Sequence, residues 1–166
     1  MLKLLKNIVL LILFIATILI FINIHVLVLE DVQNNKTIFI VKVNPNDEFT
    51  MTWMHSVELQ PWEEIFRIDD DYHVILDRTR FKSFGAGVPD YAGDKSEVKD
   101  GYVIFSGINK KMNDLQYGIS DFAKHTFNFS DKELRLYEHI EDGNAIKIYT
   151  KPLNMLEYFI KKAASI

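Results

Sequence analysis

The sequence predicts a mainly β protein, an antiparallel β-sandwich or a partly closed barrel, with one transmembrane helix before it and a short helix after it. Three observations lead to this fold class. A continuous apolar segment occupies the first 24 residues, alternating apolar and polar residues follow, and apolar residues return to helical spacing after Pro152. We therefore expect a membrane anchor over residues 1–24, a β domain over residues 25–151 and an amphipathic helix over residues 152–166.

The apolar segment has the length and the flanking charges of a membrane span. Residues 4–24 number 21, and a helix of that length extends about 31 Å, which is one hydrocarbon thickness. Lys3 and Lys6 stand at its start, whereas Glu30 and Asp31 follow its end. Because positive charge favours the cytoplasmic side, we expect a single-pass protein of the cell membrane with a cytoplasmic N-terminus and an extracytoplasmic domain.

We expect this anchor to remain uncleaved. A cleaved signal peptide ends in small residues, but Ala16 is the only alanine in the apolar segment, which ends in bulky residues. The alternative is a buried core helix, and a helix that is apolar on every face fits that role poorly in so small a domain. All 23 aspartates and glutamates lie from Glu30 onward with 17 of the 19 lysines and arginines, which gives the outer domain a net charge of −6.

The region between the two predicted helices shows the alternation of half-buried strands, interrupted by the Asn, Asp, Gly and Pro residues typical of turns. Short strands at near-regular spacing favour a sandwich or a barrel. A polar segment over residues 85–99 is expected to be a long loop. The expected strands cover residues 25–31, 37–43, 48–57, 62–69, 74–81, 101–106, 115–119, 124–129, 134–140 and 145–150.

Two polar residues share predicted strand faces with large apolar ones. His55 alternates with Trp53, and Glu64 alternates with Trp62. A hairpin with a loop of two or four residues around residues 58–61 would place His55 opposite Glu64. Because a buried ionisable group needs a hydrogen-bonded partner, this pair either fixes the register of the hairpin or forms a polar pocket that binds a small ligand.

The same region resembles a known family. The motif His55-Ser56-Val57-Glu58 is followed by Pro61, Glu64 and Phe66, and then by Phe81-Lys82-Ser83-Phe84-Gly85-Ala86-Gly87-Val88-Pro89. These elements resemble the HSVE and GAGxP motifs of a bacterial domain family of unknown function, over roughly residues 25–150. Members of that family are small extracytoplasmic proteins with a hydrophobic leader, often encoded beside the fused permease of TAXI-type TRAP transporters.

The resemblance implies a shared ligand site, but it carries over no catalytic residue. The candidate ligand-binding residues are those at the matching motif positions: His55, Ser56, Glu58, Glu64, Ser83, Gly85, Gly87 and Pro89. The resemblance also implies a partner, which is a TRAP-type permease or its solute-binding protein. The long C-terminal helix departs from the family pattern.

Composition and motifs argue against several other functions. The chain has no cysteine, which excludes thiol nucleophiles and thiolate metal sites, and its net charge of −4 disfavours nucleic-acid binding. No phosphate-binding loop or metal-ligand spacing occurs, so we expect no cofactor and no metal. The leading hypothesis is a membrane-anchored extracytoplasmic accessory or binding protein. The alternatives are an envelope enzyme that uses His55 and Glu64 as an acid–base pair and a purely structural membrane subunit.

Overall fold

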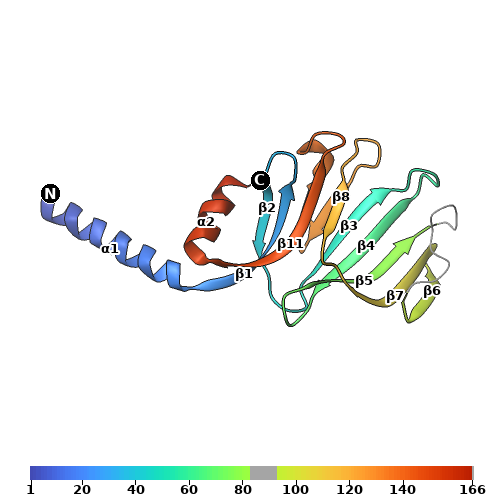
Figure 1. Cartoon of the computed structure of the whole chain (residues 1–166), viewed down its shortest axis with the longest axis horizontal. Helices are drawn as coiled ribbons and strands as arrows, with labels where there is room; N and C mark the ends of the chain where they lie inside the picture. Colours follow the sequence, from blue (N-terminus) through green and yellow to red (C-terminus); the bar gives the residue numbers. More distant parts are fainter. Residues whose placement is uncertain (83–92, 166) are drawn as a thin grey trace.

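The computed structural model describes residues 1–82 and 93–165. Two antiparallel sheets pack face to face as a sandwich that is not closed into a barrel, which confirms the predicted fold class and decides between its two forms (Figure 1). Sheet A has the strand order β2-β1-β11-β8, and sheet B has the order β10-β9-β3-β4-β5-β7-β6. The elements are α1 (Leu2–Phe21), β1 (Asn23–Asp31), β2 (Lys36–Lys42), β3 (Glu48–Met54), β4 (Pro61–Ile68), β5 (Val74–Phe81), β6 (Lys95–Lys99), β7 (Tyr102–Lys111), β8 (Leu115–Gly118), β9 (Thr126–Phe129), β10 (Lys132–Arg135), η1 (Leu136–Glu138), β11 (Ala145–Asn154) and α2 (Met155–Ala164).

The main core lies between the two sheets. Phe49 of β3 stacks on Phe66 of β4 with ring centroids 4.8 Å apart, and its centroid lies 5.5 Å from that of Phe127 of β9. Leu27 and Leu29 of β1 join the same apolar cluster from sheet A. All five side chains are almost fully buried, so close packing of their alternating inward positions holds the two sheets together.

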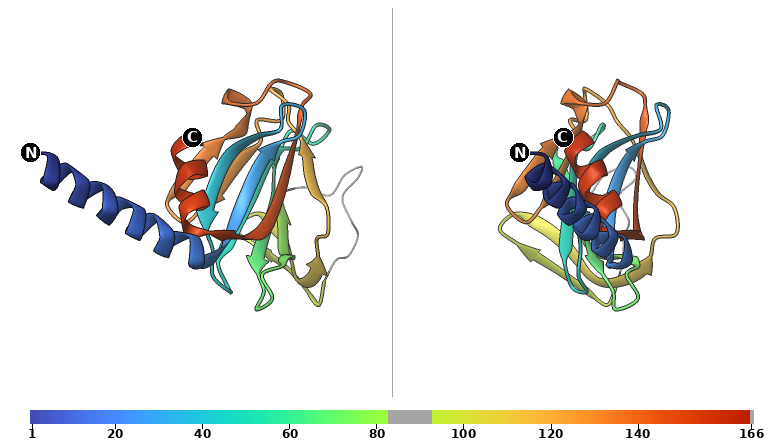
Figure 2. Two further views of the ribbon diagram at one scale, coloured as in Figure 1. Left: turned by 60° about the vertical axis from the view of Figure 1, so that its left-hand side comes forward. Right: turned by 90° about the vertical axis from the view of Figure 1, so that its left-hand side faces the viewer.

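Helix α2 forms a third layer on the outer face of sheet A (Figure 2). Its residue Tyr158 packs with Val26 and Val28 of β1 in a second apolar cluster. Strand β1 is therefore covered on both faces, which explains why residues 26–29 are each at most 1% exposed. The side chain of Asn154 caps the helix.

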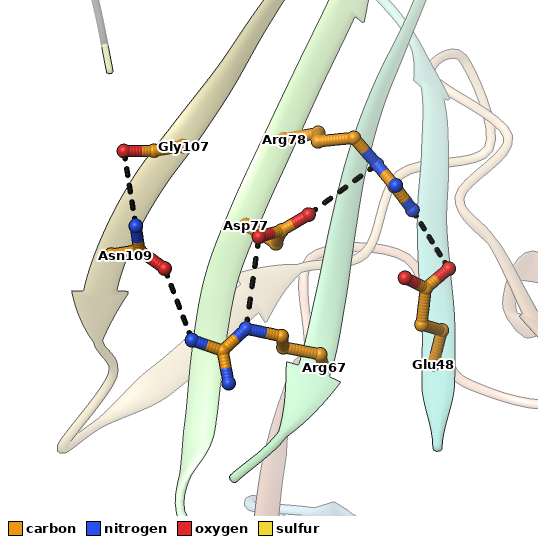
Figure 3. Close-up of polar contacts among 6 residues, drawn as sticks. All are labelled: Glu48, Arg67, Asp77, Arg78, Gly107 and Asn109. Carbon is orange, nitrogen blue, oxygen red and sulfur yellow. Dashed lines mark hydrogen bonds and ion pairs between the residues drawn. The ribbon is translucent and has the colours of Figure 1, made fainter. Parts of the chain in front are cut away.

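The outer face of sheet B instead carries a chain of charged and polar contacts that crosses four strands (Figure 3). Arg78 of β5 lies 2.7 Å from Glu48 of β3 and 3.5 Å from Asp77. Asp77 lies 3.7 Å from Arg67 of β4, whose guanidinium donates a 3.0 Å hydrogen bond to Asn109 of β7. Asp77 is the extra residue of a β-bulge, and this position lets its carboxylate reach both arginines.

The N-terminal helix differs slightly from the predicted span. Helix α1 ends at Phe21 and β1 begins at Asn23, whereas hydropathy alone extends the span to Ile24. The helix is long and apolar enough to cross a membrane, and none of its side chains is buried in the domain. Ile24 is only 8% exposed because it belongs to the apolar cluster beneath α2. An apolar strand that directly continues an apolar helix cannot be separated from it by hydropathy.

Two predicted elements of the β domain are corrected by the strand pairing. Residues 95–99 were expected to be loop, but they form the edge strand β6, which pairs with β7. All five side chains of β6 are exposed, so the strand has no apolar alternation that hydropathy could detect. Residues 134–140 do not form one strand, because β10 ends at Arg135 and the short helix η1 follows.

The C-terminal helix begins later than the sequence predicts. Strand β11 continues to Asn154, so Pro152 lies in a strand opposite His25 and α2 starts at Met155. Strand β8 pairs with β11 only as far as Ile148. Beyond that point β11 has a strand on one side only, which is the edge environment that tolerates a proline without an N–H.

Candidate functional site

The turn between β3 and β4 decides how the predicted site residues are arranged. Met54 pairs with Pro61 and Met51 pairs with Glu64, so the turn covers residues 55–60. The predicted pairing of His55 with Glu64 is therefore wrong. The observed register differs from the predicted one by an even number of residues, so the Glu64 side chain stays on the predicted face of its strand. His55 lies outside the strand, in the turn. The acid–base pair required by the enzyme alternative is not formed.

His55 closes this turn through hydrogen bonds of its own. Its backbone N–H donates to the Gln60 carbonyl, and its carbonyl accepts from the N–H of Leu59, each at 2.9 Å. Its Nδ1 atom accepts a 3.2 Å hydrogen bond from the N–H of Glu58. These three bonds stabilise the longer turn and end the strand ladder at Met54. Because Nδ1 is an acceptor, we assign the ring proton to Nε2, which leaves Nε2–H as a donor.

Trp62 of β4 packs against His55 but leaves its own polar group without a partner. The Trp62 ring stacks on His55 at a centroid distance of 5.6 Å and on Phe81 at 4.8 Å. Trp62 is 8% exposed, and its indole Nε1–H has no hydrogen-bond acceptor within the described residues. An unsatisfied buried donor costs about 1–3 kcal/mol. Among the described residues, this is the only buried side-chain nitrogen or oxygen in that state.

This indole lines a small depression at the surface, which we call the Trp62 depression. The depression has a cavity volume of about 10 Å³, far below the roughly 300–1,000 Å³ of sites for drug-sized ligands and close to the room that one water-sized group needs. The ammonium of Lys82, one of its lining residues, lies 5.0 Å from the ring centroid of Tyr102. The complete lining consists of His55, Glu58, Gln60, Pro61, Trp62, Phe81 and Lys82. Aromatic rings therefore line this space together with polar side chains of both charges, the carboxylate of Glu58 and the ammonium of Lys82.

Glu64 occupies a different environment, in the interior between the sheets. Its carboxylate accepts a hydrogen bond from the hydroxyl of Tyr117, which belongs to β8 of sheet A. Burial raises the pKa of Glu64, although the Tyr117 hydrogen bond and the charge of Lys110 oppose this change. Burial and the adjacent carboxylate likewise raise the pKa of Tyr117. The Glu64–Tyr117 hydrogen bond thus connects the two sheets, which is a structural role.

The family model of a domain of unknown function, DUF1850, matches residues 49–136. These residues make up more than half of the chain. The chain belongs to the DUF1850 family. The DUF1850 region contains nearly all of sheet B together with β8, whereas α1, β1, β2, β11 and α2 lie outside it. No curated protein and no solved structure matches this chain.

Within the DUF1850 region, the structure brings only some of the predicted site residues together. His55 and Glu58 line the Trp62 depression, whereas Ser56 is exposed in the turn and Glu64 lies in the interior. The other predicted residues lie outside the described part of the chain: Ser83, Gly85, Gly87 and Pro89. In residues 1–82 and 93–165, no cluster of three or more His, Cys, Asp or Glu side chains is arranged to hold a metal ion.

Three residues that belong to the Trp62 depression or to the hydrogen bond of Glu64 were not among the predicted site residues. Trp62 shares a predicted strand face with Glu64 but was not a candidate site residue, although the N–H of a buried indole needs an acceptor. Lys82 lies within the motif over residues 81–89, but the sequence did not indicate that its ammonium lies beside the β3–β4 turn. Tyr117 lies 53 positions after Glu64 in the sequence, and strand alternation does not show which residues of two sheets face each other.

Proposed function

We propose that this DUF1850 protein is a membrane-anchored binding domain that holds the carboxylate of a small organic acid in the Trp62 depression. The observation that carries this proposal is the buried Nε1–H of Trp62, for which the described residues provide no acceptor. A carboxylate oxygen would satisfy this donor. The Nε2–H of His55 and the ammonium of Lys82 are two more donors among the lining residues, and charge-assisted bonds of this kind favour an anion.

Helix α1 is the membrane anchor in this proposal. Its 20 residues extend about 30 Å, and Lys3 and Lys6 at its start favour a cytoplasmic N-terminus. The turn between β3 and β4 lies on the side of the domain away from α1 (Figure 1). In this orientation, the Trp62 depression faces the extracytoplasmic space, where dissolved solutes can reach it.

The partner that we propose is a TAXI-type TRAP permease or its solute-binding protein. The support is the resemblance of His55-Ser56-Val57-Glu58 and of the motif over residues 85–89 to a family often encoded beside such permeases. These transporters carry organic acids and amino acids, which is the ligand chemistry that the donors of the Trp62 depression favour.

The ligand proposal is tested on the full chain in detergent micelles, with ¹⁵N placed only in the tryptophan indoles. The chain has two tryptophans, so the spectrum contains two indole N–H signals that a Trp53→Phe variant assigns. We expect the Trp62 signal to shift saturably when small mono- and dicarboxylates are added. The Trp53 signal is expected to move less, although its ring lies only 5.9 Å from that of Trp62.

The matched variant is Trp62→Phe, which keeps an aromatic ring in the stack and removes only the N–H donor. We expect carboxylate binding to weaken by about tenfold, because one buried hydrogen bond to an anion is lost. A Trp62 signal that stays unchanged across the whole carboxylate panel would contradict the proposed function.

The partner proposal is tested separately, by affinity purification of the C-terminally tagged full chain from detergent-solubilised membranes of its native host. We expect a TRAP permease or solute-binding protein to be recovered with it. If neither protein is recovered under conditions that retain other membrane complexes, the proposed partner is wrong, while the ligand proposal is unaffected.

A further inference from the structure

Helix α2 carries an apolar stripe that the domain does not cover. Tyr158 packs on sheet A and is 6% exposed, whereas Phe159 and Ile160 are 52% and 62% exposed. Leu156 and Ala163 extend these two residues into a stripe at positions i, i+3, i+4 and i+7 of the helix. Packing on sheet A therefore accounts for one side of α2 and leaves most of the apolar stripe exposed, with Leu156 half-buried at its start.

The start of α2 is attached directly to the end of α1. The backbone N–H of Met155 donates a 2.8 Å hydrogen bond to the carbonyl of Ile22, the residue that follows α1. Figures 1 and 2 show α1 leaving the domain on the side that α2 covers, and Figure 1 shows α2 running across the direction of α1. A bilayer crossed by α1 would therefore meet the outer side of α2 along its length.

The contact between the two helices places α2 at the depth of a membrane surface. Ala16 and Leu19 are the partly covered residues of α1, and the remaining α1 residues are exposed. They lie roughly 3–8 Å along the axis before the end of the helix. Amphipathic helices at a membrane surface lie about 5–10 Å into the boundary between headgroups and acyl chains.

The charges of α2 agree with that position. Its last turn contains Lys161 and Lys162, whose long side chains can extend past an apolar stripe toward lipid phosphates. The ammonium of Lys162 donates a hydrogen bond to the hydroxyl of Tyr158. Cationic residues beside an exposed apolar stripe are typical of helices that bind anionic lipid surfaces.

We propose that α2 is an interfacial helix whose apolar stripe, Leu156, Phe159, Ile160 and Ala163, lies in the bilayer surface, with its lysines at anionic headgroups. The proposal rests on the anchor role of α1 and is independent of any ligand in the Trp62 depression. A second membrane contact beside the span prevents the sandwich from rotating freely about α1. It therefore holds the β3–β4 turn at a defined orientation to the membrane.

The test uses spin labels on the full chain, which has no native cysteine. The chain is reconstituted into vesicles of phosphatidylcholine with a minor fraction of phosphatidylglycerol, and the label is attached at Ile160→Cys. Leu11→Cys in α1 is the control for a lipid-exposed site. Val98→Cys in β6, which is 75% exposed, is the control for a water-exposed site. Collision rates with oxygen, which concentrates in lipid, and with a water-soluble nickel chelate measure the surroundings of each label.

The measured quantity is the ratio of the collision rate with oxygen to the collision rate with the nickel chelate. We expect this ratio to be several-fold higher for the Ile160→Cys label than for the Val98→Cys label. A ratio equal to that of Val98→Cys, with Leu11→Cys in lipid, would show that α1 is anchored and α2 is not interfacial. Exposure of Leu11→Cys to the nickel chelate would overturn the anchor and this inference together. Shielding of Ile160→Cys from both reagents, with coupling between labels, would assign the stripe to a second copy of the chain.

Discussion

The outer faces of the two sheets are completed in opposite ways. Sheet A directs Val26 and Val28 outward and covers them with Tyr158 of α2. Sheet B directs Arg67 and Arg78 outward, where they form ion pairs that remain partly exposed. Inward and outward side chains alternate in both sheets, and the inward ones share one interior. The outer faces differ because α2 covers the apolar residues of sheet A, whereas the charged residues of sheet B stay in contact with solvent. Apolar burial stabilises strongly, whereas exposed ion pairs contribute little.

The largest effect is expected on the covered face of sheet A. Tyr158→Ala should lower the free energy of unfolding by about 3 kcal/mol, because it removes a buried aromatic ring and leaves a cavity under α2. Chemical denaturation of the full chain in micelles measures the change. Phe122→Ala is the control for removing an aromatic ring, since Phe122 is 60% exposed and lies outside the apolar stripe of α2. An equal loss in both variants would mean that α2 does not cover sheet A through Tyr158.

The interior between the two faces should show an intermediate effect. Tyr117→Phe removes the hydroxyl that donates to the half-buried Glu64 carboxylate. We expect a loss of about 1–3 kcal/mol in the free energy of unfolding at neutral pH, because the carboxylate loses a donor where water reaches it only in part. Tyr102→Phe on β7 provides a control for removing a tyrosine hydroxyl. A Tyr117→Phe variant as stable as the parent would show that the two sheets do not depend on this bond.

The pH dependence of stability should report the environment of Glu64, which faces the interior that the two sheets share. Burial raises the folded-state pKa of Glu64 above its ordinary value of 4.5. The folded state then binds more protons than the unfolded state between these two pKa values, so this group's contribution to stability falls as pH rises through that window.

Glu64→Gln removes the ionisation and keeps an acceptor for Tyr117. We expect the stability of Glu64→Gln relative to the parent to increase as pH rises above 4.5 and through the raised folded-state pKa of Glu64, and then to level off. Urea denaturation at several pH values measures the difference. A difference between Glu64→Gln and the parent that stays constant with pH would contradict the assignment.

The smallest effect is expected on the open face of sheet B. Arg78→Met removes the contacts with Glu48 and Asp77 and keeps much of the aliphatic side chain. We expect a loss of about 0–1 kcal/mol that decreases with added salt, as for other exposed ion pairs. A loss as large as that of Tyr158→Ala would mean that the contacts in Figure 3 act as a cooperative network.

Much of the fold was predictable because it follows from local patterns. The apolar run predicts α1, and alternation in Phe49, Met51 and Phe66 predicts strands whose inward residues build the main core. Strand β6 was not predictable in this way, because its exposed residues are ordered only by pairing with β7. The extension of β11 through Pro152 depends in the same manner on which strands stand beside it.

The ligand site at the motif residues stays a prediction. The strand expected over residues 48–57 ends at Met54, so His55-Ser56-Val57-Glu58 lies in the turn, and two of its residues line the Trp62 depression. The predicted partner of His55 was wrong, because His55 closes a six-residue turn through hydrogen bonds with Gln60, Leu59 and Glu58. That the described residues offer the Trp62 indole no acceptor follows only from the tertiary structure.

The sequence by itself therefore determined the apolar helix, the β class and which side of most strands faces inward, because these depend on the order of residues along one segment. The tertiary structure alone decided the six-residue turn over residues 55–60, the bond between Glu64 and Tyr117, and the cover of α2 on sheet A. These contacts join segments that are distant in the sequence. They depend on how the layers pack against each other, and the periodicity of a single strand does not predict that packing.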